Sequence, residues 1–233
     1  MNYQENKFTS GEADNWFERN KDPMKDGSII AKDWPLFIIE KYGLKPAKVL
    51  EIGCSNGYRL AEIKSRYDSY CLGIEPSKKA IEDGRKTWPD LEFREGILSE
   101  LPINDDEKFD LTIVNYVLHW ASRDLLLKSI NEVDRTVLDG GYLIIGDFMP
   151  DFPSKNWYHH LSNDEVYTYK IDYKEIFLKT GIYRLVSSFT YEVSSKTSKA
   201  DTNSDNRGVC SLLQKSLNNF YLDTSGKKSS THQ

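Results

Sequence analysis

The sequence is poor in several features that would place it in a specialised class of proteins. Its 233 residues include only three cysteines, an odd and widely spaced set, so we expect reduced thiols rather than a disulfide framework. The histidines and cysteines show no spacing typical of a metal site, and no metal is expected. No apolar run approaches the roughly 20 residues of a membrane-spanning helix, and the first residues lack the basic and apolar segments of a signal peptide. A cytoplasmic location without membrane insertion is therefore expected.

An excess of positive charge is also missing. The formal net charge is −5, which gives no general attraction to phosphate polymers, so nucleic acid is not expected as a partner. Apolar side chains, in contrast, make up 39% of the residues, which is enough for the core of one domain. We expect that domain over residues 45–222, after a cover segment and helix over residues 1–44. A flexible polar tail is expected over residues 223–233.

Apolar segments alternate with amphipathic ones along most of the chain. Buried strands are expected near residues 48–52, 70–75, 91–95, 109–115 and 141–147. Helical periodicity fills the gaps between these segments, and a further helix is expected from Trp34 to Tyr42, where Pro35 is near its start. Two more strands are expected near residues 183–193 and 207–215. This alternation indicates a doubly wound α/β fold.

The most informative segment is residues 49–57, in which an apolar strand ends at Glu51 and enters a turn that contains Gly53 and Gly57. In an open parallel sheet, such a turn lies at the carboxyl edge, where glycines let ligand atoms approach the backbone. Glu75 follows the next apolar strand, 22 residues after Gly53, and its carboxylate can accept both hydroxyls of a ribose. This arrangement predicts a site for a nucleotide-like ligand.

A dinucleotide site would need glycines at the first, third and sixth positions of this turn, which are occupied by Gly53, Ser55 and Tyr58. The tyrosine opposes the close packing of helix against strand that brings a pyrophosphate onto a helix N-terminus. A dinucleotide oxidoreductase is therefore disfavoured. A ligand without a pyrophosphate has no such requirement.

The turn resembles the first motif of class I S-adenosylmethionine (SAM)-dependent methyltransferases, with Ser55 in place of the middle glycine. The likeness continues through residues 75–77, 96–102, 109–120 and 140–147. It covers about residues 45–150 and implies a Rossmann-like, seven-stranded and mostly parallel sheet whose last strand is antiparallel. It also implies SAM as the cofactor and S-adenosylhomocysteine as the product.

The resemblance implies where the cofactor would lie. The glycine turn would contact the methionine part, Glu75 would bind the ribose, and Glu51 would order the turn from below. Many relatives carry an aspartate after the glycine of the third motif, whereas this chain has Ile97, so adenine is expected against backbone groups and apolar side chains. A core position without ligand contact is the alternative for Ile97. The expected cofactor residues in the domain are Glu51, Gly53, Cys54, Ser55, Gly57, Glu75, Pro76, Ile97, Leu98, Asn115 and Tyr116.

The polar N-terminal segment contains a cluster of aromatic and charged side chains at residues 16–20. We interpret it as a segment that folds over the site, in which Arg19 pairs with the SAM carboxylate and the aromatic side chains cover the cofactor. A plain packing role is the alternative for these residues.

A sulfonium methyl group is already activated, so its transfer chiefly needs an acceptor held at attack distance. An oxygen acceptor usually also needs its proton removed, which gives a nearby histidine or carboxylate a role. The candidates for this role are His119, Asp147, His159 and His160. The last two lie in the long aromatic connection 148–172, which we interpret as a substrate loop. A structural or surface role is the alternative for each candidate.

The aromatic and histidine side chains of this loop suit a sugar or a nucleotide-linked sugar as acceptor. They also give a likeness to bacterial methyltransferases of surface-polysaccharide and nonulosonic-acid pathways. The expected function is transfer of a methyl group to an oxygen of such a small molecule. The alternatives are a small phosphorylated or natural-product acceptor, and a SAM-binding interaction protein without turnover. The sequence leaves the acceptor, the base and the oligomeric state open.

Overall fold

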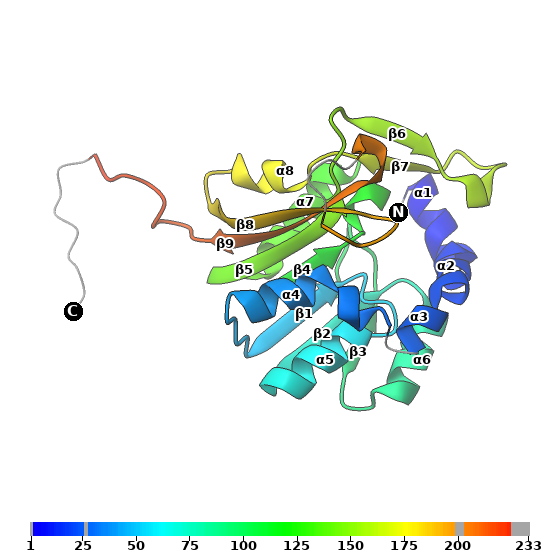
Figure 1. The fold of residues 1–233 in the computed structure, drawn as a ribbon, viewed down its shortest axis with the longest axis horizontal. Helices are drawn as coiled ribbons and strands as arrows, with labels where there is room; N and C mark the ends of the chain where they lie inside the picture. The colour runs from blue at the N-terminus through cyan, green and yellow to red at the C-terminus, as the bar shows by residue number, and fades with distance from the viewer. Residues whose placement is uncertain (1, 26–27, 199–202, 225–233) are drawn as a thin grey trace.

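The computed structural model describes residues 2–25, 28–198 and 203–224. Seven strands form one sheet in the order β3-β2-β1-β4-β5-β9-β8 (Figure 1). The strands β1 to β5 pair in parallel, and β9 runs antiparallel to both of its neighbours. The predicted fold class is thereby confirmed. The strand bounds are β1 (Lys48–Ile52), β2 (Tyr70–Glu75), β3 (Glu92–Glu95), β4 (Phe109–Asn115), β5 (Val137–Phe148), β8 (Tyr183–Glu192) and β9 (Arg207–Lys215).

Helices cover both faces of this sheet, because successive side chains of a strand point to opposite faces. Val49 of β1 joins an apolar core with the helices α4, α5 and α6, whereas Leu50 and Ile52 join a second core with α7 and α8. The sheet is therefore buried on both faces, as the continuous apolar strands predict. The helix bounds are α4 (Trp34–Lys41), α5 (Tyr58–Tyr67), α6 (Lys78–Thr87), α7 (Leu126–Thr136) and α8 (Lys174–Leu178).

Helix α4 begins where its capping residues predict. The Asp33 carboxylate accepts a hydrogen bond from the Leu36 backbone N–H at 3.0 Å, and Pro35 lies in the first turn. Helix α6 begins in the same way, since the Ser77 hydroxyl accepts from the Ala80 N–H at 3.1 Å. Both helices start at the carboxyl side of the sheet, next to the predicted ligand turn.

The polar N-terminal segment has no strong apolar periodicity, yet the structure is helical there. The segment consists of α1 (Tyr3–Lys7), a π-helical turn (Phe8–Glu12), α2 (Ala13–Asn20) and α3 (Asp22–Lys25). It begins with a capping box between Asn2 and Glu5. Figure 1 shows these helices along one side of the sheet rather than in a layer of their own.

The connection after β5, expected as a loop, also contains regular structure. Strands β6 (Ser154–Trp157) and β7 (Tyr167–Lys170) form a small antiparallel sheet, which lies beside α1 (Figure 1). The Gln4 side chain joins the two segments, because its amide nitrogen donates to the backbone oxygens of Tyr167 and Trp120. A partner more than 150 residues away in sequence thus stabilises this connection, which local patterns do not reveal.

Two segments lie partly outside the described residues. The polar stretch between the last two expected strands, residues 194–206, is described except at 199–202, and most of the predicted flexible tail, 225–233, is not described. Within the described part of the chain, no helix has the length and apolar character needed to cross a membrane. The three cysteines, Cys54, Cys71 and Cys210, are buried free thiols.

Candidate functional site

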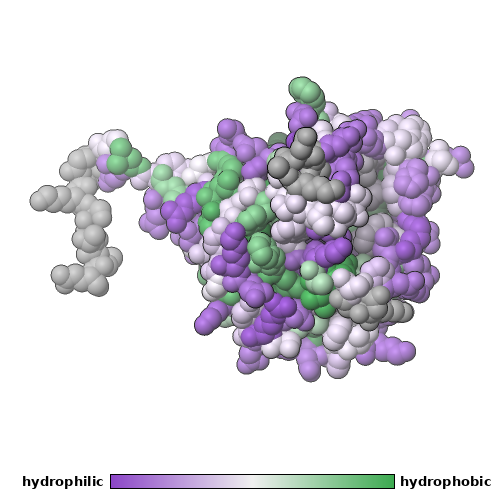
Figure 2. All heavy atoms as spheres, in the orientation of Figure 1, coloured by the Kyte–Doolittle hydropathy of each residue, from purple (hydrophilic) through white to green (hydrophobic). Residues whose placement is uncertain are grey.

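A cavity of about 430 Å³ lies at the carboxyl ends of β1, β2 and β4. Its volume falls in the range of small-molecule sites, roughly 300–1,000 Å³. Figure 2 shows hydrophobic side chains gathered in a hollow near the middle of one face of the molecule. Ten of the twelve residues predicted to contact the cofactor line the cavity, namely Glu51, Gly53, Cys54, Ser55, Glu75, Pro76, Ile97, Leu98, Asn115 and Tyr116.

The glycine turn after β1 forms the floor of the cavity. The backbone N–H groups of Gly53 and Cys54 both donate to the Ile74 carbonyl oxygen, at 2.7 and 3.2 Å, which fixes the turn against β2. Gly53 has a φ of +73°, and a Cβ atom there would overlap the Val117 side chain. Both its backbone conformation and its closeness to Val117 therefore require glycine.

Gly57 has a different role from the one predicted. It does not line the cavity, and a Cβ atom on it would lie 2.6 Å from the Phe93 ring. Its φ of +79° places it at the start of α5 in the left-handed conformation. Gly57 thus allows α5 to pack closely on the sheet instead of contacting a ligand.

Glu75 ends β2 with its carboxylate at the cavity wall. One carboxylate oxygen accepts from the Ser55 N–H at 2.9 Å, and the other accepts from the Ser77 N–H at 3.0 Å. Burial raises the pKa of the Glu75 carboxyl to about 7, although these two backbone hydrogen bonds act in the opposite direction. The carboxylate is therefore held in one orientation and retains acceptor capacity for hydroxyl groups of a ligand.

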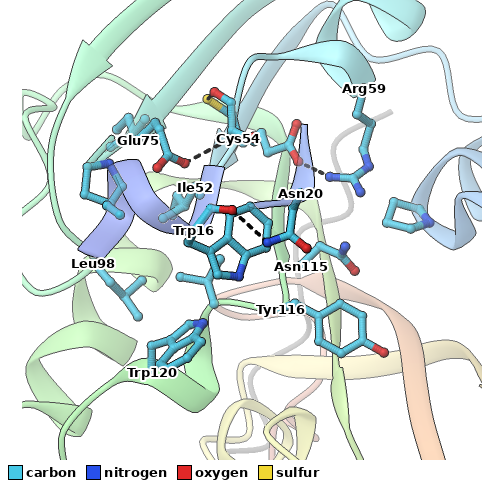
Figure 3. A pocket seen from close by; sticks show the side chains of 18 of the residues that line it. Trp16, Asn20, Ile52, Cys54, Arg59, Glu75, Leu98, Asn115, Tyr116 and Trp120 are labelled. Carbon is cyan, nitrogen blue, oxygen red and sulfur yellow. Dashed lines mark hydrogen bonds and ion pairs between the residues drawn. The ribbon is translucent and has the colours of Figure 1, made fainter. Parts of the chain in front are cut away.

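A buried charge cluster lies at the other side of the cavity. Figure 3 shows Glu75 and Arg59 on opposite sides of Cys54. The Arg59 guanidinium donates to Asp33 at 2.8 to 3.0 Å and also pairs with Glu51. Burial raises the pKa of Glu51 to about 7, and Arg59 opposes this shift. The Glu51 Oε2 atom is buried and has no hydrogen-bond partner among the described residues. One carboxylate oxygen beneath the glycine turn thus remains available to a ligand.

The N-terminal helices cover the cavity. Phe8, Trp16, Asn20 and Met24 line it from the side opposite the sheet, and Figure 3 shows Trp16 and Asn20 close to the cavity wall. The Asp14 carboxylate anchors α2, since it accepts from the Ser77 hydroxyl at 2.7 Å and the Lys79 N–H at 3.1 Å. The same end of α6 thus contacts the cover and, through Ser77, the Glu75 carboxylate.

Arg19 does not line the cavity. Its guanidinium pairs with Glu12 and donates to the Tyr158 hydroxyl at 2.8 Å, while that hydroxyl donates to Glu12 at 2.6 Å. The predicted pairing of Arg19 with a cofactor carboxylate thus has no support from this geometry. The physical reason is that Glu12 ends the π-helical turn directly before α2, within reach of the Arg19 side chain.

Two of the four candidate bases form a pair. The His119 Nδ1 atom lies 2.9 Å from an Asp147 carboxylate oxygen, and the backbone N–H groups of His119 and Phe148 donate to the same carboxylate. Both side chains are buried and neither lines the cavity, but the neighbouring residues Tyr116 and Trp120 do. Because a carboxylate only accepts, we assign the proton to Nδ1, which leaves Nε2 as a proton acceptor.

The two loop histidines lie elsewhere. His159 and His160 are exposed on a short 3₁₀ helix, and neither lines the cavity. Tyr158, immediately before them, is the buried residue of this segment and packs on Trp120 and Phe8. The connection therefore contacts the cover through a tyrosine, and the structure gives no geometric support to a role for either loop histidine.

Several lining residues were not expected from the sequence. Asp33 and Trp34 suggest only a helix start, and Arg59 suggests the exposed face of an amphipathic helix. An arginine in the first turn of α5, directly after the ligand turn, was the available signal. The cavity residues of this kind are Lys32, Asp33, Trp34, Arg59, Val117, Trp120, Tyr191 and Lys196.

Known proteins resemble this chain over the segment that forms the site. Residues 50–145 match a family model described as a methyltransferase domain. An uncharacterized protein of Rickettsia prowazekii is 33% identical over 115 residues, which cover 47% of this chain and 46% of that protein. An O-methyltransferase of Penicillium expansum is 26% identical over 119 residues, which cover 47% of this chain and 42% of that protein. The matched segments thus span less than half the length of either curated relative.

Solved structures share the architecture. A SAM-dependent methyltransferase of Methanosarcina mazei has a TM-score of 0.61 at 20% identity, over 77% of this chain and 97% of that one. An N-methyltransferase of Bradyrhizobium japonicum, solved with S-adenosylhomocysteine, has a TM-score of 0.58 at 14% identity, over 87% and 98% of the two chains. The chain thus has the fold of class I SAM-dependent methyltransferases, and its residues 50–145 match a methyltransferase domain.

The residues of the cavity fit SAM, the cofactor of the methyltransferases that share this fold. Gly53 brings its backbone to the cavity without a side chain, Glu75 presents an acceptor for ribose hydroxyls, and Glu51 has an oxygen without a hydrogen-bond partner among the described residues. Ile97 and Leu98 line the wall where relatives carry an aspartate. Their positions favour apolar packing of an adenine ring over a side-chain hydrogen bond.

Proposed function

We propose that this protein transfers a methyl group from SAM to an oxygen of a small-molecule acceptor in the cytoplasm. The acceptor class that we favour is a sugar, a nucleotide-linked sugar or a related surface-polysaccharide precursor. The observation that carries the proposal is the single cavity that joins the glycine turn, Glu75 and the aromatic cover. Three buried free thiols are consistent with a reducing compartment.

Bound SAM would supply a methyl group that is already activated on a sulfonium sulfur. The chain itself has three tasks. The glycine turn and Glu75 orient the cofactor, while the cover formed by Phe8 and Trp16 excludes water. The His119–Asp147 pair, beside the cavity at the end of β4, is suited to accept a proton from a hydroxyl acceptor at Nε2. His119 and Asp147 are therefore the candidate bases that the geometry favours.

Two measurements test this proposal. Isothermal titration calorimetry with S-adenosylhomocysteine and, separately, NAD checks the cofactor, and we expect binding of the former only. Incubation with methyl-labelled SAM and a panel of sugars, nucleotide-linked sugars, small phosphorylated compounds and natural-product hydroxyls then identifies the acceptor. Transfer to a phosphorylated or natural-product compound alone would replace the favoured acceptor class. Cofactor binding without transfer to any member would favour a SAM-binding interaction protein.

Glu75→Ala is expected to weaken the binding of S-adenosylhomocysteine by about 2 kcal/mol, the scale for loss of a charged hydrogen-bond acceptor. The physical reason is that the Ser55 and Ser77 N–H groups fix this carboxylate at the wall of the cavity, where it can accept from hydroxyl groups of the ligand. Calorimetry on the folded variant measures this loss. An unchanged dissociation constant would remove Glu75 from the site.

The raised pKa of Glu75 predicts a pH dependence of cofactor affinity. Ribose hydroxyls donate to the ionised carboxylate. The affinity for the cofactor should therefore be highest above the Glu75 pKa of about 7 and should fall as the pH drops through that value. Between about pH 8 and about pH 6, we expect roughly tenfold weaker binding. In Glu75→Gln this dependence should flatten. If that variant keeps the wild-type slope, the titrating group is Glu51, whose pKa is also raised to about 7.

Removal of the cover is expected to weaken cofactor binding. Trp16→Ala should lower the affinity for S-adenosylhomocysteine about tenfold, because an aromatic side chain that lines the cavity contributes roughly 1–2 kcal/mol when a ligand packs on it. Deletion of residues 1–25 should have a larger effect. Tyr3→Ala is a matched control, since Tyr3 is an exposed aromatic of the same segment that does not line the cavity. Equal affinities for all three variants and the wild type would contradict a covering role.

A further inference from the structure

Backbone strain in this protein is concentrated around the cavity. Four non-glycine residues of the described ranges adopt a left-handed backbone with φ between +52° and +58°: Ser55, Asp68, Tyr116 and Lys196. Three of these line the cavity, and only Asp68 does not. Strained conformations of this kind persist only where the surrounding structure fixes them, and they cluster at active sites and ligand-binding sites. Ser55 and Tyr116 belong to the predicted cofactor site, whereas Lys196 has no assigned role.

Lys196 occupies a position that normally favours glycine or asparagine. Its N–H donates to the Glu192 carbonyl oxygen at 2.7 Å, and the Glu192 N–H donates to the Thr197 carbonyl oxygen at 2.9 Å, so Lys196 closes a tight turn after β8. A left-handed residue at such a turn is usually small, because a Cβ atom is unfavourable there. A long cationic side chain at this place thus needs a reason other than the turn itself.

The Lys196 side chain has unused hydrogen-bonding capacity. It lines the cavity at the side of the Arg59 cluster, and its ammonium group forms no hydrogen bond or ion pair with the described residues. Burial lowers the pKa of Lys196, although Asp33 opposes the shift. The Asp33 carboxylate already accepts from Arg59, Tyr58 and the Leu36 N–H. The ammonium group is therefore partly desolvated without a partner of its own.

Other donors gather at the same place. The Trp34 indole N–H is buried without a hydrogen-bond partner in the ranges that the structure covers, and its ring stacks on Tyr191 with centroids 5.1 Å apart. The Lys32 side chain also lines the cavity, and its ammonium group donates to the Ser195 carbonyl oxygen at 3.4 Å. The two carboxylates of this side, Asp33 and Glu51, both pair with Arg59. The three cationic side chains Lys32, Arg59 and Lys196 thus meet two carboxylates here, and this excess of positive charge favours an anionic ligand group.

We propose that Lys196, together with the Trp34 N–H and Lys32, binds an oxyanion of the ligand that fills the cavity. This inference rests on the proposed function and deepens it. The oxyanion has two possible sources, the α-carboxylate of the cofactor, which was predicted to pair with Arg19, or an acidic group on the acceptor. Lys196 is then a specificity-determining residue, because its charge selects a ligand that carries a negative group at this position.

The two sources are distinguished by ligands that differ only in the amino-acid end. S-adenosylhomocysteine carries the α-carboxylate, whereas 5′-methylthioadenosine lacks the whole amino-acid part. Calorimetry with both ligands on the wild type and on Lys196→Met forms the first arm. The second arm titrates inorganic phosphate into the complex with S-adenosylhomocysteine. A cofactor source predicts about tenfold or greater weakening for S-adenosylhomocysteine and none for 5′-methylthioadenosine. An acceptor source predicts unchanged cofactor affinity and phosphate binding that Lys196→Met abolishes.

A second variant separates binding from folding. Lys196→Asn removes the ammonium group and keeps a residue that tolerates the left-handed backbone, so we expect an unchanged or higher Tm together with the binding loss of Lys196→Met. Asp68→Asn is the matched control, since Asp68 has the same backbone conformation outside the cavity, and it should leave both ligand affinities unchanged. A packing role for Lys196 would instead lower Tm and leave the ratio of the two ligand affinities unchanged.

The remaining outcomes overturn either the inference about Lys196 or the proposed function. If Lys196→Met weakens the binding of S-adenosylhomocysteine and of 5′-methylthioadenosine equally, the ammonium group does not bind the carboxylate, and the inference is overturned. The inference is also overturned if Lys196→Met leaves the cofactor affinity unchanged and phosphate does not bind the wild-type complex with S-adenosylhomocysteine. Wild-type protein that binds neither adenosine ligand would instead contradict the proposed function, independently of Lys196.

Discussion

Gly53→Val is expected to weaken the binding of S-adenosylhomocysteine more than about a hundredfold, the largest effect on affinity that we predict for a single substitution. The side chain would overlap Val117, and both residues line the cavity, so either the turn or the wall must shift. The φ of +73° adds strain, because a β-branched residue is strongly disfavoured in the left-handed region. Overpacking of this kind costs about 1–3 kcal/mol in addition.

The control for Gly53→Val is Gly140→Val. Gly140 also has a positive φ, +86°, but a Cβ atom on it would have no neighbour within 4 Å. The two variants thus share the backbone strain and differ in the steric overlap and in the closeness to the cavity. Calorimetry together with thermal unfolding measures both effects. If folded Gly53→Val binds S-adenosylhomocysteine as tightly as Gly140→Val does, the turn does not contact the cofactor.

His119→Ala is expected to lower the turnover of an oxygen acceptor by about a hundredfold or more, with the affinity for S-adenosylhomocysteine nearly unchanged. The reason is the orientation of the ring, whose Nδ1 lies 2.9 Å from Asp147 and whose Nε2 we propose as the acceptor of the proton. Asp147→Asn should also lower turnover, because an amide at this place no longer fixes the same tautomer. Steady-state kinetics with the identified acceptor checks both variants.

The loop histidines provide the comparison for this prediction. His159 and His160 are exposed, and no carboxylate of the described residues orients either ring, so His159→Ala and His160→Ala should keep turnover close to that of the wild type. A large loss of turnover in either loop variant, with His119→Ala unaffected, would reverse the assignment of the base. Full turnover in all four variants would leave proximity of acceptor and methyl group as the source of the rate.

The cofactor side of the site follows closely from the sequence. Residues 49–57 combine an apolar strand with a glycine turn, and both features are local, so their geometry can be predicted without knowledge of distant partners. Glu75 ends the next strand, and parallel strands place their carboxyl ends at one edge of the sheet. Gly57 shows the limit of this reasoning, since a glycine in the motif can serve the packing of α5 against Phe93 instead of the ligand.

The cover and the acceptor side were less predictable. The helices over residues 3–25 have little periodicity of their own and pack on distant segments, as the Gln4 contacts with Tyr167 and Trp120 show. Arg19 could be recognised as a functional candidate, but its partner Glu12 depends on a π-helical turn that no sequence signal indicates. His119, in the short 3₁₀ helix after β4, pairs with Asp147 near the end of β5, 28 positions later in the sequence.

The sequence by itself determined the alternation of strands and helices, the glycine turn and the acid that follows each of the first two strands. These features depend on side-chain periodicity and on backbone freedom, which are properties of neighbouring residues. Only the tertiary structure decided which distant side chains share the cavity. The strand order places β9 between β5 and β8, and Lys196 of the turn after β8 lines the same cavity as Trp34 and Arg59. The physical reason is that such contacts follow from the packing of the whole sheet, so the residues next to them in the sequence do not indicate them.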